Sequence, residues 1–217
     1  MGARGVRAMR VCWSVKGGSG TTVFACALAV AIAERHGHTT VIDLCGDVPA
    51  VLGIAEPPGR GVRDWLMGSD RDPSQLDELA VAAGTNLRMI PAGTPGSFDD
   101  GALEDLLHAS RGRHVVVDFG MMRPSETLRQ RASADYLVSR PCYLSLRRAA
   151  RLTQRPRSVV LMNEQGRSLT KRDVQAVVGA PVVAEIGVTE GIARCVDAGL
   201  LATRLPKSLA ADLAVLV

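Results

Sequence analysis

Short apolar runs alternate with helix-forming segments along the whole chain, and this alternation restricts its possible folds more than any other feature of the sequence. Several runs are continuous in Val, Ile and Leu without polar alternation, which is typical of parallel strands buried on both faces. The predicted strands cover residues 10–15, 39–44, 86–90, 114–119, 136–139, 158–162 and 181–186. The predicted helices cover residues 22–36, 61–67, 99–109, 144–152, 170–178, 190–197 and 209–217.

This repeated strand–helix order predicts a single α/β domain over residues 1–217. We expect a doubly wound, mainly parallel sheet of about seven strands with helices on both faces. We find no internal repeat, low-complexity tract or interdomain linker, and we interpret residues 56–61 and 91–96 as strand-end loops. Sheets of this kind bind ligands at the carboxyl ends of their strands, so functional residues are sought there.

The composition excludes several classes of protein. Apolar residues make up 47% and charged residues 22% of the chain, as in ordinary globular domains, so wholesale disorder is excluded. The net charge of +4 is too small to identify a nucleic-acid-binding protein. The five cysteines include no C-x-x-C pair, and the four histidines show no metal-ligand spacing. Neither a disulfide framework nor a zinc site is expected, and the predicted location is the reducing cytoplasm.

The first predicted strand runs into a glycine-rich loop, Ser14-Val-Lys-Gly-Gly-Ser-Gly-Thr-Thr22, and a long apolar helix follows at once. Glycines allow successive backbone N–H groups to turn toward one anion, and the helix start adds unpaired N–H donors and a positive dipole end. Thr22 lies where a hydroxyl can coordinate a phosphate-bound Mg²⁺. The alternative is a glycine turn that only connects a strand to a helix. Lys16 draws attention because the chain has only three lysines against 23 arginines.

Four strand ends together resemble the MinD/ParA ATPases, which are P-loop NTPases with a deviant Walker A loop. The segment Lys16-Gly-Gly-Ser-Gly-Thr-Thr22 resembles their loop, K-G-G-x-G-K-T. Val-Ile-Asp43-Leu resembles their second strand end, and Val-Val-Val-Asp118-Phe-Gly resembles their Walker B strand. Asn163 falls where the family places an asparagine that contacts adenine. The resemblance covers the chain from about residue 10 to residue 163.

This resemblance implies ATP and Mg²⁺ as cofactors and gives each strand-end residue a role. Thr22 would hold the metal, and Asp43 and Asp118 would order its water shell. Lys16 would reach across a homodimer to the phosphates bound by the partner subunit. The phosphates would lie on the loop residues Gly17, Gly18, Ser19, Gly20 and Thr21, and the adenine would contact Asn163.

The sequence departs from the family pattern at two places in this site. Thr21 stands where the family has a second lysine that cradles the β- and γ-phosphates; losing such a bond costs about 1.5–3 kcal/mol, roughly 10- to 150-fold in affinity. Cys45 stands where a second acidic residue positions the attacking water, and we interpret it as a small apolar filler. Asp47 is the candidate to replace that acid, because pilus-associated relatives of the CpaE/TadZ type have a similar Gly-Asp. Lys16 and Asp47 are therefore the candidate catalytic residues.

Two later segments also differ from the family. Residues 185–189, Glu-Ile-Gly-Val-Thr, occupy the place of an Ile-Pro-x-Asp loop beside the base, so adenine selectivity is predicted less firmly than phosphate binding. Residues 209–217 lack the cationic face of MinD's membrane-anchoring tail, and we expect a docked or dimer-packing helix. The longest apolar run, residues 23–33, is well short of the roughly 20 residues that span a bilayer, so stable membrane insertion is not expected.

A basic segment lies between Arg140 and Arg157, with six arginines and no acidic residue. Arg147, Arg151 and Arg155 would share one helix face if the helix continued that far. Such a face could hold DNA nonspecifically through its phosphates. A solvated arginine face is the alternative.

The sequence as a whole predicts a nucleotide-binding, dimerising switch with weak or slow ATPase activity. By resemblance, it would position a division, partition, pilus or secretion machine through a protein partner. Two alternatives stay open: a catalytically inactive pseudo-ATPase scaffold that acts through protein docking, and a partition-type protein that binds DNA nonspecifically. The loss of the second loop lysine at Thr21 is what puts hydrolysis in question.

Overall fold

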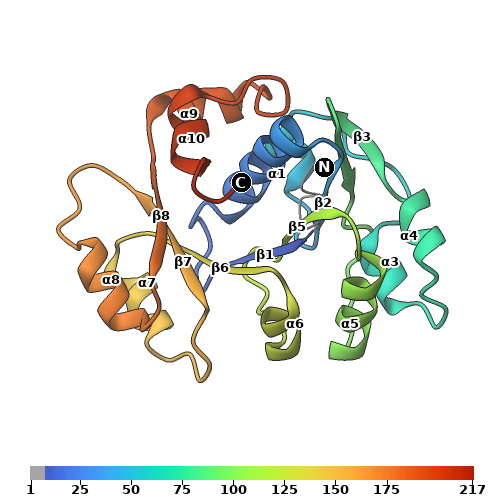
Figure 1. The fold of residues 1–217 in the computed structure, drawn as a ribbon, viewed down its shortest axis with the longest axis horizontal. Helices are drawn as coiled ribbons and strands as arrows, with labels where there is room; N and C mark the ends of the chain where they lie inside the picture. Colours follow the sequence, from blue (N-terminus) through green and yellow to red (C-terminus); the bar gives the residue numbers. More distant parts are fainter. Residues whose placement is uncertain (1–7) are drawn as a thin grey trace, which may run out of the picture.

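The structure is a computed structural model that describes residues 8–217. Within this part of the chain, eight strands form one sheet in the order β3-β4-β2-β5-β1-β6-β7-β8 (Figure 1). All neighbouring strands are parallel except β3 and β4, which are antiparallel. The strands are β1 (Met9–Trp13), β2 (Thr39–Asp43), β3 (Val81–Gly84), β4 (Leu87–Ile90), β5 (His114–Asp118), β6 (Ala134–Ser139), β7 (Ser158–Asn163) and β8 (Val182–Gly187). The predicted doubly wound α/β fold is confirmed.

The seven predicted strands are all present, and their ends differ from the prediction by no more than two residues. The prediction missed β3, which is a short edge strand. Its sequence, Val-Ala-Ala-Gly, has a single β-branched residue and is largely exposed, so it gives no strand signal. The strand forms because the chain turns back at Asn86, whose positive φ of 56° is tolerated by asparagine, and pairs with β4.

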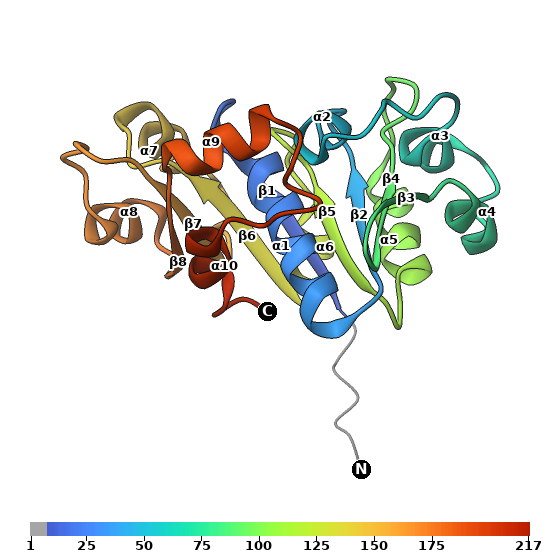
Figure 2. The ribbon, with the colours of Figure 1, turned by 90° about the horizontal axis from the view of Figure 1, so that it is seen from above.

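Helices cover both faces of the sheet (Figures 1 and 2). One face carries α1 (Thr21–His36), α2 (Val48–Leu52), α9 (Glu190–Asp197) and α10 (Lys207–Leu213). The other carries α3 (Val62–Met67), α4 (Pro73–Glu78), α5 (Asp100–Ala109), α6 (Glu126–Arg131), α7 (Tyr143–Ala149) and α8 (Lys171–Val178). The prediction missed α2, α4 and α6 because five or six residues are too few to show a helical period.

The chain ends in a helix that is docked on the sheet. The predicted helix at 209–217 is α10, which is shorter and begins two residues earlier. Leu209 and Leu213 are buried, and the Asp212 carboxylate accepts a hydrogen bond from the Gly187 N–H at 3.0 Å. The docked interpretation of this segment is therefore confirmed.

The condition for a single arginine face, a helix that continues to Arg155, is not met. Helix α7 ends at Ala149, so Arg151 and Arg155 lie beyond it. Pro156 disfavours helical backbone at the preceding residue, and the Arg155 side chain instead donates to the Val178 carbonyl at 3.1 Å. The arginines of this segment are partly used to cap carbonyl groups rather than gathered on one surface.

The residue that follows α2 and the turn after α9 approach each other closely through their backbones. Gly53 has a φ of 72°, and a Cβ there would lie 2.0 Å from the Gly199 carbonyl oxygen. We expect Gly53→Ala to lower the free energy of unfolding by at least about 2 kcal/mol, because left-handed strain and a backbone clash add. Gly59→Ala is the matched control: its φ is 94° with nothing within 4 Å, so it carries only the conformational cost. Equal losses in chemical denaturation would contradict the steric contact.

Candidate functional site

The glycine-rich loop follows β1 and is shaped by its own hydrogen bonds. The Ser14 N–H donates to the Gly120 carbonyl at 2.8 Å, which joins the end of β1 to the end of β5. The Ser19 hydroxyl donates to the Lys16 carbonyl at 2.7 Å and is buried within the loop. Gly18 and Gly20 have φ values of 69° and 88°, which glycine adopts at little cost. These hydrogen bonds and glycine conformations define the shape of the loop.

Helix α1 begins directly at this loop and presents an uncapped start. Gly20 is its N-cap and offers no side-chain hydrogen bond, and no acidic residue lies in the first turn. The N–H groups of that turn and the positive end of a 16-residue helix therefore lack an anionic partner there. Thr21 is buried and Thr22 half-buried at the same end. This is the arrangement of an anion-binding helix terminus.

An open cavity of about 460 Å³ lies against the loop. Its walls come from the carboxyl ends of three adjacent strands, β1, β2 and β5, together with α3. They comprise Ser14, residues 17–23, Leu44, Cys45, Asp47, Arg63 and residues 119–122. A cavity edged by glycine N–H groups and a helix start fits a polyphosphate better than an apolar ligand.

Asp43 organises the loop between β2 and α2. Its side chain is fully buried, and one carboxylate oxygen accepts the N–H groups of Cys45 at 2.9 Å and Gly46 at 2.7 Å. The other oxygen accepts the N–H of Val48 at 3.0 Å. These three bonds hold the exposed Asp47 at the cavity wall. The role at a metal's water shell stays a prediction for Asp43, whereas its anchoring of this loop is a finding.

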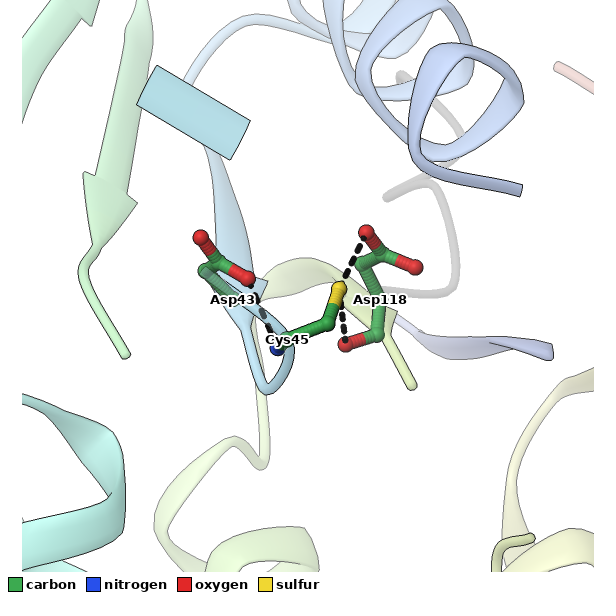
Figure 3. A group of neighbouring side chains, drawn as sticks. All are labelled: Asp43, Cys45 and Asp118. Carbon is green, nitrogen blue, oxygen red and sulfur yellow. Dashed lines mark hydrogen bonds between the residues drawn. The ribbon is translucent and has the colours of Figure 1, made fainter. Parts of the chain in front are cut away.

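Asp118 is buried at the end of β5 and is bonded from two sides. The Cys45 thiol donates to one carboxylate oxygen at 3.0 Å (Figure 3). The Gly120 N–H donates to the other oxygen at 2.9 Å. Burial raises the pKa of Asp118, and the charge of Asp43 adds to that rise. The Thr22 hydroxyl lies 3.9 Å from the Cys45 sulfur. The three residues predicted to bind the metal, Thr22, Asp43 and Asp118, thus all lie beside Cys45.

Cys45 does more than fill space in this cluster. Burial, followed by the charge of Asp118, raises the pKa of the Cys45 thiol far above neutrality, so the sulfur keeps its proton and acts as a donor. Ligand atoms of Asp43, Cys45 and Asp118 lie within 4.8 Å of one another. A protonated thiol cannot serve as a base for the attacking water.

We expect Cys45→Asp to destabilise the metal-free protein, because a third carboxylate would join two buried ones. The free energy of unfolding in EDTA should fall by about 2 kcal/mol. Added Mg²⁺ with ATP should recover most of this loss, since binding to the folded state stabilises it. Cys45→Ser, which keeps a donor at the same place, is the control: it should lose no stability in EDTA and gain no more from Mg²⁺ and ATP than the wild type does. A loss that Mg²⁺ and ATP leave unchanged would contradict a cation site here.

The two candidate catalytic residues lie at different places. Asp47 lines the cavity, and its action on an attacking water stays a prediction. Lys16 is half-buried and does not line the cavity; its ammonium group donates to the Gly17 carbonyl at 2.8 Å. The predicted action of Lys16 on a partner subunit stays a prediction.

Asn163 lies at the exposed end of β7 and does not line the cavity at the glycine loop. It lines a second hollow of about 570 Å³ together with Gly187, Val188 and Thr189. The structure therefore brings Asn163 beside the segment that was expected to flank the base. Met162, the preceding residue, reaches back to the loop, since a Cβ on Gly20 would lie 3.2 Å from its methyl carbon. Contact of Asn163 with adenine stays a prediction.

Sequence reasoning missed Arg63 and the methionines at the cavity. Arg63 lies in α3, and its Nε and Nη2 donate to the Leu44 carbonyl at 3.2 and 2.7 Å. Met121 is 62% exposed at the rim, and a Cβ on Gly17 would lie 3.2 Å from its sulfur. No local pattern marks these residues, because they reach the site through the packing of α3 and the turn after β5.

Comparison with known proteins gives a clear result for the fold. No protein-family model and no curated protein matches the sequence. A ParA family ATPase from Chlorobium tepidum TLS superposes with a TM-score of 0.76 at 21% identity, covering 99% of each chain. MinD in the MinC:MinD cell division complex of Aquifex aeolicus gives 0.72 at 18%, covering 96% of this chain and 95% of that one. MinD with Mg-ADP from Pyrococcus horikoshii OT3 gives 0.69 at 18%, covering 97% and 93%.

These likenesses extend over nearly the whole chain, including the part after Asn163 where the sequence resemblance ends. The chain therefore has the fold of the ParA and MinD ATPases. At this identity the similarity concerns architecture alone. No helix among residues 8–217 is long and apolar enough to cross a membrane.

Proposed function

We propose that the protein is a nucleotide-dependent dimerising switch that binds ATP with Mg²⁺ and hydrolyses it slowly. The observation that carries this proposal is the glycine loop, which together with the uncapped start of α1 borders a cavity beside Asp118. Among the similar structures, MinD of Pyrococcus horikoshii holds Mg-ADP. The bound metal would supply charge neutralisation at the phosphates.

Each residue of the site has its own role in nucleotide binding or hydrolysis. Backbone N–H groups of residues 17–21 bind the phosphates, and the Thr22 hydroxyl coordinates the metal. Asp118 orders the metal's water shell and is itself held by the Gly120 N–H and the Cys45 thiol. Asp47 orients the attacking water from the cavity wall. Hydrolysis is slow because positioning and charge stabilisation dominate phosphoryl transfer, and the loop lacks a lysine at Thr21.

The cellular role in this proposal is the positioning of a larger machine through a protein partner. The similar structures include a MinC:MinD cell division complex, in which an ATPase of this fold is bound to another protein. We extend to this chain a cytoplasmic location and a partner from a division, partition, pilus or secretion system. DNA binding is a weaker candidate, because the basic segment forms no single arginine face.

Lys16→Ala tests the switch. We expect wild-type protein to dimerise when ATP and Mg²⁺ are added, and the variant to stay monomeric at equal nucleotide occupancy, because it loses the charge that reaches the partner's phosphates. Sedimentation velocity with and without nucleotide measures this. Lys171→Ala is the matched control: it removes a lysine from α8, where the side chain pairs with Glu185 on the surface at 3.2 Å. Nucleotide-dependent dimers of the Lys16 variant would contradict the bridging role.

The pseudo-ATPase scaffold remains the second candidate, and Thr21 is the observation that favours it. Its buried side chain brings no charge to the cavity. A scaffold would show no nucleotide binding at millimolar ATP and an oligomeric state indifferent to ATP. The same sedimentation experiment, with ATP binding measured by calorimetry, separates the two candidates.

A further inference from the structure

We propose that Arg63 binds the terminal phosphate of ATP from within the same subunit and supplies the positive charge that the loop lacks at Thr21. The inference rests on the proposed function and deepens it, because it names the residue that distinguishes a nucleoside triphosphate from a diphosphate. It concerns a residue of α3, outside every strand end and loop that the sequence resemblance covers.

The position of Arg63 is fixed by two anchors. Gly61 is the N-cap of its helix, α3, and the Asp64 carboxylate accepts the Gly61 N–H at 2.7 Å and the Thr94 N–H at 3.1 Å. The Arg63 side chain then extends to the end of β2 and donates twice to the Leu44 carbonyl. Two bonds to one oxygen orient a planar guanidinium and hold it against the loop that carries Cys45 and Asp47.

The charge of Arg63 has no carboxylate partner. Among residues 8–217 it forms no ion pair, and the group with which it hydrogen-bonds is a neutral carbonyl. A guanidinium stays protonated at all ordinary pH values. Of the described residues that line the phosphate cavity, Arg63 is the one cation, since Lys16 lies outside the lining. A half-buried cation on the wall of a cavity edged by the glycine loop and the start of α1 is suited to an anionic ligand.

The location of Arg63 determines which phosphate of a bound nucleotide its side chain can contact. Loop N–H groups of this kind hold the phosphates nearest the nucleoside, and a cationic side chain reaches the outer ones. Arg63 lines the cavity at the end of β2, where it donates to the Leu44 carbonyl, while Gly120 and Met121 of the turn after β5 also line the space. When the inner phosphates of a triphosphate lie on the loop, a cation at the end of β2 contacts the terminal phosphate.

Calorimetric affinities for ATP and for ADP, both with Mg²⁺, test the proposal. In Arg63→Ala we expect ATP affinity to fall about 10- to 100-fold while ADP affinity changes less than about threefold, because one charge-assisted bond is lost. Retained ADP binding also shows that the variant is folded. Arg111→Gln is the control: it removes an exposed arginine from the turn before β5, at the amino end of that strand, and should leave both affinities unchanged.

Three results would overturn the inference. An unchanged ATP-to-ADP preference in Arg63→Ala would show that Arg63 does not contact the terminal phosphate. An equal loss for both nucleotides would show that Arg63 only shapes the cavity. If wild-type protein bound neither nucleotide at millimolar concentration, the proposed function itself would fail, and this inference with it.

Discussion

Replacing Asp135 with alanine is expected to lower the free energy of unfolding by about 3–5 kcal/mol, because it leaves a buried arginine without its counter-charge. One Asp135 carboxylate oxygen accepts the Trp13 indole N–H at 2.7 Å. The other accepts the Arg157 N–H at 3.0 Å and lies 3.4 Å from Arg129. The Arg129 and Asp135 side chains are 3% and 0% exposed, so water cannot take over these contacts.

Urea denaturation of Asp135→Ala measures this loss, and Asp105→Ala is its control. Asp105 pairs with Arg71 at 3.0 Å, but its side chain is 46% exposed, so that pair contributes at most about 1 kcal/mol. Trp13 ends β1 directly before the glycine loop, and Arg129 lies 5.3 Å from its ring. We therefore expect Asp135→Ala to weaken nucleotide binding as well. Similar losses for both variants would contradict the importance of the buried network.

Asp118→Asn is expected to have opposite effects on stability and on function. Binding of ATP with Mg²⁺ should weaken on the order of 10- to 100-fold, the usual cost of removing a group that orders a metal's ligands. The ligand-free protein should become more stable at pH 7 to 8, because asparagine needs no buried charge. Thermal unfolding and nucleotide titration on the same samples measure the two effects.

The stability difference between Asp118→Asn and the wild type should depend on pH in a definite direction. Burial raises the pKa of Asp118 in the folded protein above its unfolded value. The protonated carboxyl is therefore favoured by folding, and its contribution is fully present below the unfolded pKa and lost as pH rises through the folded pKa. The stability gain of the variant over wild type should shrink toward zero in acid and be largest at neutral pH. A gain that does not depend on pH would contradict a buried charge at this position.

The fold could be predicted because its information is local. Uninterrupted Val and Ile runs such as residues 115–117 form parallel strands wherever helices cover both faces, and the strand ends follow within two residues. The glycine loop could be predicted for the same reason, because its glycines and the strand and helix that flank it are contiguous in the sequence. Edge strand β3 and the shortest helices carried no such periodic signal.

The rest of the site depends on contacts that no local segment contains. Asp43 was expected at a metal, yet its carboxylate is used by three N–H groups of its own loop, a geometry visible only once that loop is folded. Cys45 was interpreted as filler, but β5 brings the Asp118 carboxylate beside its thiol. Arg63 reaches the cavity only because α3 packs at the end of β2.

The central position of β1 has a consequence for synthesis of the chain. Met9 pairs with Val115 on one side and Arg10 with Ala134 on the other, so both neighbours of β1 are made long after it. A chain emerging from the ribosome therefore carries β1 with both edges unpaired until β5 and β6 have left the exit tunnel. Long-range parallel pairing of this kind folds slowly and exposes strand edges meanwhile. The bond from the Ser14 N–H to the Gly120 carbonyl, which ties the glycine loop to the end of β5, can therefore form only late in synthesis.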